Sequence, residues 1–295
     1  MAGFARVEVE VAADVHADVG EGPFWDEQTK TLLFVDVSAG AVFRHDPILR
    51  TTSSFSVGQE VGAVVARRGG GLVLAVRDGI ATVSGTGEGF ELTAPVERDI
   101  PANRMNDAKC DPVGRLYAGT MAFDFSPGAA ALYRVEPDWS CEQVLGGLTI
   151  SNGLAWSRDG SRMYFIDSVA QGVDLFDYDL SSGAVSNRRR IVAIDKALGM
   201  PDGMTIDDEE NIWVACWGGG AVRCFSPTGV QLGEVLFPVS QVSSCTFGGP
   251  GLRDLYVTSG LYGLSSEQLD KEPLAGATFV CSPGATGMPA SLFAG

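Results

Sequence analysis

Residues 202–227 read DGMTIDDEENIWVACWGGGAVRCFSP, and they set out a pattern that the chain repeats. A small or polar residue precedes a short apolar strand, a turn rich in Asp, Gly or Pro follows, and two further strands rich in β-branched and aromatic residues complete the unit. The same pattern occurs in residues 20–47, GEGPFWDEQTKTLLFVDVSAGAVFRHDP; 106–121, NDAKCDPVGRLYAGTM; 152–168, NGLAWSRDGSRMYFIDS; 244–260, SCTFGGPGLRDLYVTSG; and, more weakly, 62–85, GAVVARRGGGLVLAVRDGIATVSG. The sequence therefore predicts six copies of one β-rich unit.

The spacing of these copies predicts the fold. The equivalent positions, in chain order, are Gly22, Gly62, Asp107, Gly153, Gly203 and Ser244. Successive positions lie 40 to 50 residues apart, a period typical of the blades of a β-propeller. Helical patterns with a period of 3.6 residues are almost absent, which argues against α/β barrels and doubly wound sheets. We therefore predict an all-β, six-bladed β-propeller that forms a single domain over residues 1–295.

The N-terminal segment is expected to close the ring. Residues 5–15, ARVEVEVAADV, alternate between apolar and polar side chains as a strand with one exposed face does. We expect this strand to complete the last blade beside residues 277–283, ATFVCSP. Closure leaves only short, protected strand edges.

Charge and hydropathy limit the partners. The chain carries a formal net charge of −16, with a pI near 4.4. Such a surface repels phosphates, so neither nucleic acid nor a membrane is expected as a partner, and a small molecule is expected instead. The first 20 residues lack the continuous apolar segment of a signal peptide, and no run of about 18 apolar residues occurs. These features predict a cytoplasmic protein, and they carry no signal for its oligomeric state.

Several common catalytic and binding patterns are disfavoured. The six cysteines form no Cys-x-x-Cys pair, and several lie in apolar strand-like runs, which indicates reduced thiols rather than a disulfide framework. With only two histidines, His16 and His45, a zinc site of His and Cys ligands or a Ser-His-Asp triad is hard to assemble. The glycine-rich residues 84–90, SGTGEGF, lie between strand-like runs and are interpreted as a turn rather than a phosphate-binding loop.

Four oxygen-bearing side chains share one position in the repeat, directly before the equivalent positions given above. They are Glu21, Asn106, Asn152 and Asp202. Equivalent positions of the innermost strands of a propeller converge at one end of the central channel, and carboxylate and amide oxygens suit Ca²⁺, Mg²⁺ or Mn²⁺. The alternative is four separate turn residues, and Asp202 does lie in Pro-Asp-Gly, a good turn sequence. The shared register favours a cation site.

Long motifs in a fixed order resemble those of one protein family. The motifs are GEGP (residues 20–23) followed by Trp25 and Asp26; NRMNDAKCDPVGRLYAGTM (103–121); SNGLAWSRDGSRMYFIDS (151–168); PDGMTIDDEENIWVACWGGGAVRCFSPTG (201–229); and FGGPGLRDLYVTS (247–259). Over residues 20–276 they closely resemble the senescence marker protein, gluconolactonase and luciferin-regenerating enzyme family, which includes regucalcin. Residues 217–229 and 247–260 are most similar to bacterial sugar lactonases.

The resemblance implies a six-bladed propeller with one divalent metal ion near the channel mouth. Carried over by position, it implies that Glu21, Asn152 and Asp202 bind the metal directly and that Asn106 reaches it directly or through water. We expect Ca²⁺ first, with Zn²⁺, Mn²⁺, Mg²⁺ or Fe²⁺ as alternatives, because relatives work with several divalent ions.

The resemblance also implies residues that bind the substrate. Arg104 and Asn106 are expected to face the pocket, where Arg104 would bind a substrate oxygen. Some relatives carry a glutamate after AGTM that hydrogen-bonds the sugar. This chain reads AFDF there, so the shorter Asp124 is the candidate nearest that place.

Lactone hydrolysis is the reaction that the resemblance implies. Attack on a lactone turns its carbonyl oxygen into an oxyanion, which a bound cation stabilises. Asp202 is the expected general base that accepts a proton from water. We therefore predict a gluconolactonase-like hydrolase of carboxylic ester bonds that opens a small, sugar-type lactone to its hydroxy acid.

Other functions remain open. A phosphotriesterase-type hydrolase would use the same metal site to polarise P=O, a noncatalytic calcium-binding protein like regucalcin would need only the ligands, and a propeller can also act as an interaction platform. Four apolar residues lie close in sequence to the predicted site: Met121, Phe123, Phe125 and Trp217. They either pack between blades or line the channel mouth, where they would favour a less polar lactone.

Overall fold

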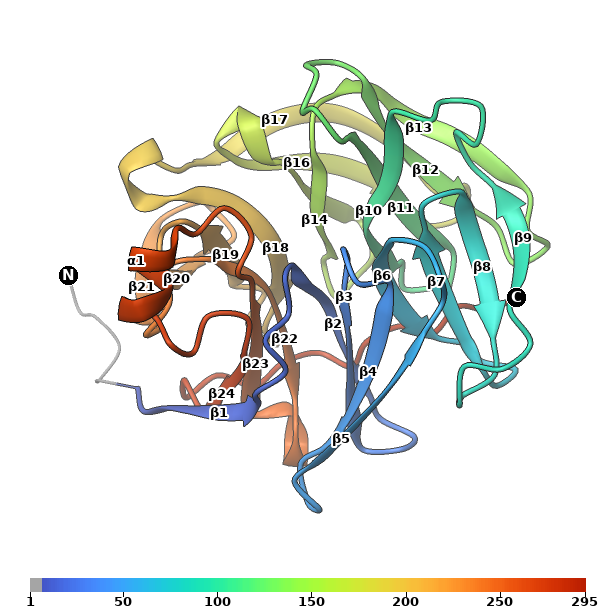
Figure 1. Cartoon of the computed structure of the whole chain (residues 1–295). Helices are drawn as coiled ribbons and strands as arrows, with labels where there is room; N and C mark the ends of the chain where they lie inside the picture. Colours follow the sequence, from blue (N-terminus) through green and yellow to red (C-terminus); the bar gives the residue numbers. More distant parts are fainter. Residues whose placement is uncertain (1–6) are drawn as a thin grey trace.

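The computed structural model describes residues 7–295, whose strands form six four-stranded antiparallel sheets. The sheets are arranged around a ring (Figure 1). Each sheet is one blade, and the first strand of each blade packs against the first strands of the blades before and after it, which closes the ring. The predicted six-bladed, all-β propeller is confirmed.

Blades 1 to 5 each contain four strands that are consecutive in the sequence. Blade 1 has β2 (Gly20–Asp26), β3 (Thr31–Asp36), β4 (Ala41–Asp46) and β5 (Thr51–Ser56); blade 2 has β6 (Val61–Ala66), β7 (Leu72–Val76), β8 (Gly79–Val83) and β9 (Glu91–Pro95). Blade 3 has β10 (Asn103–Cys110), β11 (Leu116–Ala122), β12 (Ala130–Val135) and β13 (Cys141–Leu148); blade 4 has β14 (Ser151–Trp156), β15 (Arg162–Asp167), β16 (Gly172–Asp179) and β17 (Ala184–Ala193). Blade 5 has β18 (Met200–Ile206), β19 (Ile212–Trp217), β20 (Ala221–Phe225) and β21 (Gln231–Leu236).

Blade 6 combines the first strand of the described chain with its last three strands. It contains β22 (Val242–Gly248), β23 (Asp254–Ser259), β24 (Thr278–Cys281) and β1 (Val9–Ala13). Strand β1 pairs with β24 in antiparallel register, with Val9 opposite Cys281. The predicted closure beside residues 277–283 is therefore confirmed, although residues 5 and 6 of the predicted strand lie outside the described part of the chain.

Every innermost strand carries a register shift in its pairing with the second strand of its blade. The shifts lie between Glu21 and Phe24, Val61 and Ala63, Met105 and Ala108, Ser151 and Leu154, Pro201 and Met204, and Val242 and Ser244. The equivalent positions found in the sequence all fall within these intervals or at their edge. Because an extra residue in a strand re-aims the side chains beside it, the six shifts give neighbouring blades the same local geometry around the channel.

Glycine lets the innermost strands approach one another at these shifts. A Cβ on Gly153 would lie 2.7 Å from the backbone oxygen of Asp202 in the next blade. Gly22 has a φ of 53°, and a Cβ there would lie 3.0 Å from the Cα of Ala63. Larger residues at either place would push the blades apart and widen the channel mouth.

Aromatic side chains fill the spaces between blades. Trp213 of blade 5 meets Phe247 of blade 6 edge to face, with 5.6 Å between ring centroids. Tyr117 of blade 3 meets Trp156 of blade 4 at 5.1 Å. Each such pair adds about 0.5–1.5 kcal/mol beyond the burial of its apolar surface, and these pairs stabilise the packing of neighbouring blades.

The propeller contains one short α-helix among the described residues, and its cysteines form no disulfides. The single α-helix among residues 7–295 is α1 (Ser266–Lys271), and none of the helices in that range is long and apolar enough to cross a bilayer. Ser265 and Gln268 form a capping box at the start of α1. All six cysteines are free thiols; five are buried, whereas Cys141 is exposed on an outer strand.

Candidate functional site

A cavity of about 270 Å³ lies at one end of the central channel. We call it the carboxylate cavity. It is lined by Val19, Glu21, Val37, Ser38, Glu60, Arg104, Asn106, Met121, Phe123, Phe125, Ile150, Asn152, Met200, Asp202, Trp217 and Tyr262. The four positions that share a register in the repeat, and also Arg104, therefore meet in one place.

Asp202 lies inside a strand and not at a turn. It is the third residue of β18, and its side chain is buried within the ring. Glu21 holds the matching place in β2 and is also buried. The alternative of four separate turn residues does not describe these positions, because the register shifts bring them to the same end of the channel.

Asn152 presents an amide oxygen without a hydrogen-bond partner. Its Nδ2 donates to the hydroxyl of Ser168, at 3.0 Å, and this fixes the orientation of the amide. Its Oδ1 is buried and accepts no hydrogen bond from any described group. A buried acceptor that stays unpaired costs about 1–3 kcal/mol, so the fold holds an oxygen there that a ligand could use.

Burial and neighbouring negative charge raise the pKa of both carboxylates. Burial, and then the charges of Asp202 and Asp107, hold the pKa of Glu21 well above its usual range, against the lowering effect of the Gly22 N–H that donates to it at 3.0 Å. Burial and the charge of Asp107 likewise hold the pKa of Asp202 well above its usual range, against a hydrogen bond from Asn152. A positive ligand would relieve the repulsion between these groups.

Arg104 supplies one positive charge at the edge of this cluster. Its guanidinium donates to Asn106 Oδ1 and to the carbonyl oxygen of Met105, both at 2.9 Å. Burial lowers the pKa of Arg104 to about 10, although the carboxylates of Glu21, Glu60 and Asp202 act in the opposite direction. Arginine therefore stays protonated at neutral pH and faces the cavity as a cation.

Asn106 is less available than the other three residues. Its Oδ1 already accepts from Arg104, and its Nδ2 donates to the backbone oxygen of Ser151 at 3.0 Å. An amide oxygen can accept a second interaction, so contact with a cation directly or through water would leave this arrangement intact.

The donor set fits a hard divalent cation. Glu21 and Asp202 offer carboxylate oxygens, and the unpaired oxygen of Asn152 completes an all-oxygen set of the kind that Ca²⁺, Mg²⁺ and Mn²⁺ prefer. No group of three or more His, Cys, Asp or Glu side chains that could hold a metal occurs among residues 7–295. The fit therefore depends on amide oxygens as much as on carboxylates.

The apolar residues near the site line the cavity rather than only the blade interfaces. Met121, Phe123, Phe125 and Trp217 all contribute to its wall. Phe123 and Phe125 are 42% and 44% exposed, and the guanidinium of Arg77 lies 5.3 Å from the centre of the Phe123 ring. An exposed aromatic rim around a polar base is typical of a small-molecule site.

Asp124 lies outside this wall. It follows β11 in a turn, where its carboxylate accepts the N–H of Ser126 at 3.0 Å and faces solvent. Its neighbours Phe123 and Phe125 line the cavity instead. Our expectation that Asp124 contacts the substrate stays a prediction, and in this structure such contact would need the turn to move.

Sequence reasoning missed several residues of the site. Asp107 stands where four of the repeats have glycine, and its charge acts on both Glu21 and Asp202. An acidic residue at a position where four repeats have glycine could have indicated that Asp107 belongs to the site. Ser168, which orients Asn152, and Glu60 and Tyr262, which line the cavity, carried no comparable signal because they lie outside the repeated position.

Comparisons with known proteins agree with this architecture. Residues 19–260 match the family model described as the SMP-30/gluconolactonase/LRE-like region. The regucalcin of Danio rerio is 40% identical over 295 residues, which cover 99% of this chain and 100% of that protein. The human regucalcin is 37% identical over 281 residues, which cover 93% and 94% of the two chains.

Solved structures show the same likeness. A luciferin-regenerating enzyme superposes with a TM-score of 0.91 at 35% identity, covering 98% of this chain and 99% of that one. A calcium-binding protein, regucalcin, from Agrobacterium tumefaciens superposes with a TM-score of 0.93 at 25% identity, covering 99% and 98%. The family match, the identities and the shared fold together show that this chain belongs to the SMP-30/gluconolactonase/LRE-like family.

Proposed function

We propose that the protein is a metal-dependent lactonase that opens a small, sugar-type lactone to its hydroxy acid. One observation carries the proposal: two buried carboxylates and the unpaired amide oxygen of Asn152 share one cavity with the cationic side chain of Arg104. Membership of a family named in part for gluconolactonase supports the choice of a lactone.

Glu21, Asn152 and Asp202 would hold one divalent cation, with Asn106 beside them. Calcium is our first choice, because the donors are all oxygen and one related structure is that of a calcium-binding protein. When bound, such an ion withdraws charge from a carbonyl oxygen and lowers the pKa of nearby water. Ser168 would act as a positioning residue, since its hydroxyl fixes the amide of Asn152.

Asp202 would move the proton. It accepts a proton from the attacking water as the new C–O bond forms, and it returns that proton to the ring oxygen as the acyl C–O bond breaks. The products balance as one hydroxy acid from one lactone and one water. A nearby cation keeps Asp202 ionised, so its role depends on its placement next to the water rather than on high basicity.

The experiment that tests this function is a substrate panel with product analysis. Aldonolactones, alkyl-substituted lactones and an aryl phosphotriester are each incubated with calcium-loaded protein, and spontaneous opening is subtracted. We expect release of a proton and formation of a hydroxy acid from lactones. Hydrolysis of the phosphotriester alone would contradict the proposal in favour of a phosphotriesterase. Calcium binding without turnover of any substrate would instead support a noncatalytic calcium-binding role.

Arg104 is expected to orient the substrate. In the Arg104→Met variant we expect kcat/KM for lactones to fall by roughly tenfold to a hundredfold, mainly through KM, because misplacement of a substrate by about 1 Å has effects of this order. Arg98→Met, on an exposed residue six positions earlier, is the matched control. Equal kinetics in the wild type and Arg104→Met would exclude Arg104 from substrate binding.

The aromatic rim is expected to select among lactones. Loss of the Phe125 ring in Phe125→Ala removes a contact worth about 0.5–1.5 kcal/mol, so KM for an alkyl-substituted lactone should rise about two- to thirteenfold, with little change for an aldonolactone. Phe90→Ala removes a ring that is 41% exposed and does not line the cavity, and it should change neither value. A uniform change across substrates would show that the rim does not contribute to specificity.

A further inference from the structure

A second cavity lies at the opposite end of the channel. Its volume is about 340 Å³, and we call it the lysine cavity. The two cavities are lined by different ends of the same innermost strands: Asn106 and Asp202 face the carboxylate cavity, whereas Lys109 and Thr205, three residues further along each strand, face the lysine cavity. The register shifts, with buried Asp107, form the layer between them.

The C-terminal segment crosses this end of the propeller as a strap. In Figure 1 the red end of the chain runs from beside β24 across the ring toward β9. It is fixed to blade 5 by the N–H of Asp208, which donates to Thr286, and to blades 2 and 3 by the N–H groups of Phe293 and Ala294. Residues 288–291 lie between these attachments and form one wall of the lysine cavity.

Lys109 lines this cavity, and its ammonium group forms no ion pair with a described residue. From blade 3 its Nζ reaches across the channel and donates to the backbone oxygen of Met204 in blade 5, at 2.7 Å. Neither Lys109 nor Arg158, the second cation in the wall, forms an ion pair with any described residue. One of the three N–H donors of the ammonium is used by Met204, and the other two have no described partner.

The wall of the lysine cavity contrasts with the rest of the protein. The chain has a net charge of −16, yet none of the residues that line this cavity is acidic. Most of the remaining wall is apolar, with Phe24, Met288 and Pro289 among its members, and Thr246 adds a hydroxyl. A cavity with one buried positive charge and apolar walls suits a small monoanion that has an apolar body.

We propose that the lysine cavity binds a small organic carboxylate, whose oxygens accept hydrogen bonds from the Lys109 ammonium while its apolar body packs beneath the strap. A charge-assisted hydrogen bond in a site sheltered from water is stronger than a neutral one. The site is separate from the proposed lactonase centre, and it needs neither the metal nor a lactone. The opposing explanation is that Lys109 only balances the charge of Asp107 and binds nothing.

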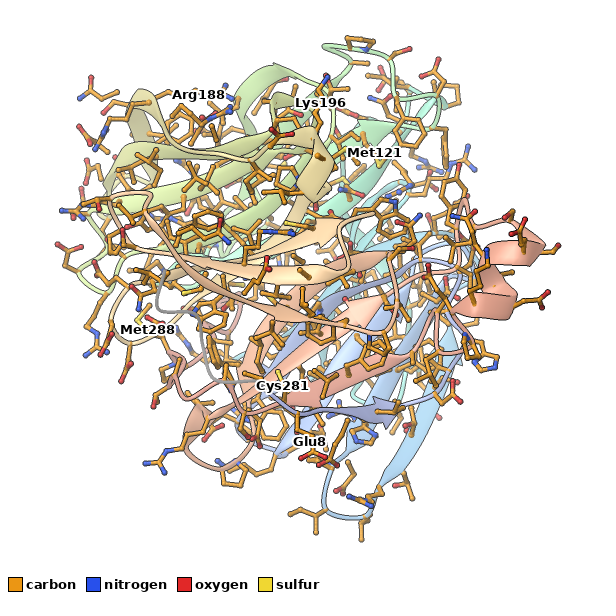
Figure 2. The ribbon with its side chains drawn as sticks, turned by 90° about the vertical axis from the view of Figure 1, so that its left-hand side faces the viewer. Glu8, Met121, Arg188, Lys196, Cys281 and Met288 are labelled. Carbon is orange, nitrogen blue, oxygen red and sulfur yellow. The ribbon has the colours of Figure 1, made fainter. Side chains whose placement is uncertain are left out.

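Methionine methyl groups report on the two cavities separately. Met288 lines the lysine cavity, whereas Met121 and Met200 line the carboxylate cavity. Figure 2 shows Met288 and Met121 well separated across the molecule. The probe is benzoate, titrated into the full chain carrying ¹³C-methyl methionine, with benzyl alcohol as the neutral counterpart. The Met288 signal is assigned with Met288→Leu.

We expect benzoate to shift the Met288 signal in a saturable way, to leave Met121 and Met200 in place, and to bind at least tenfold more tightly than benzyl alcohol. Lys109→Met should remove the shift, and Lys271→Met, the same substitution on exposed α1, should not. If Lys109→Met does not fold, Ala290→Trp on the exposed strap should block the cavity and give the same loss. An unchanged Met288 signal at saturating benzoate, or equal affinity in wild type and both variants, would overturn the proposal.

Discussion

Replacing Asp202 by asparagine is expected to lower kcat/KM for lactone hydrolysis by about 10²–10⁴-fold, the contribution of a well-placed general base. The amide keeps the size of the side chain and one oxygen in the cavity, but it cannot accept the proton of the attacking water. The fold should survive, because Asp202 sits at the channel mouth and not among the aromatic contacts between blades. Initial rates of proton release, with a saturating divalent cation, give the measurement.

The matched control for this variant is Asp208→Asn. Asp208 lies in the same blade, six residues away, and its side chain is exposed. It should keep the wild-type rate. If Asp202→Asn retains more than about a tenth of the wild-type rate while it binds the cation normally, another group must move the proton.

Replacing Glu21 by glutamine is expected to weaken the binding of Ca²⁺ by at least about 10–100-fold. Loss of an outer partner of a metal ligand already has an effect of that size, and Glu21 is proposed as a direct ligand. The substitution also removes the repulsion between Glu21 and Asp202, so the metal-free variant should unfold at a higher temperature than the metal-free wild type. Calorimetric titration and thermal unfolding measure the two effects.

The Glu60→Gln variant tests whether Glu21 contributes to calcium affinity as a direct ligand or only through the negative charge of the cavity. Glu60 lines the same cavity but lies outside the repeated position, and it faces Arg104. We expect its substitution to change calcium affinity by less than about threefold. Similar losses in Glu21→Gln and Glu60→Gln would show that the cavity attracts cations without a defined ligand set.

The fold was readable from the sequence because its defining feature repeats. Each equivalent position marks a register shift, and where that position is glycine the blades approach closely, as at Gly153. The alternation of apolar and polar side chains in residues 5–15 was enough to predict the strand β1, which pairs with β24. The path of residues 282–295 was not predictable, because the strap has no periodicity and its position depends on contacts with Ala66, Gly114 and Asp208, far away in the sequence.

The sequence predicted mainly those site residues that occupy the repeated position of the six β-rich units. The shared position in the repeat predicted that Glu21, Asn106, Asn152 and Asp202 lie together, and the family resemblance added Arg104; all five line one cavity. Side-chain direction next to a register shift does not follow the usual alternation, so the equivalent position of Asp107 did not reveal that its charge acts on Glu21 and Asp202. The same limit applies to the turn after β11, where Phe125 lines the cavity and Asp124 faces solvent.

The stoichiometric return of activity to chelated protein tests the proposed metal centre. Protein freed of metal is titrated with Ca²⁺, and bound ion and lactone hydrolysis are measured on the same samples. We predict no enzymatic turnover before addition, then a rate that rises in proportion to bound Ca²⁺ and reaches its plateau at one ion per chain. Full hydrolysis by metal-free protein would contradict the proposal that Glu21, Asn152 and Asp202 hold a catalytic cation.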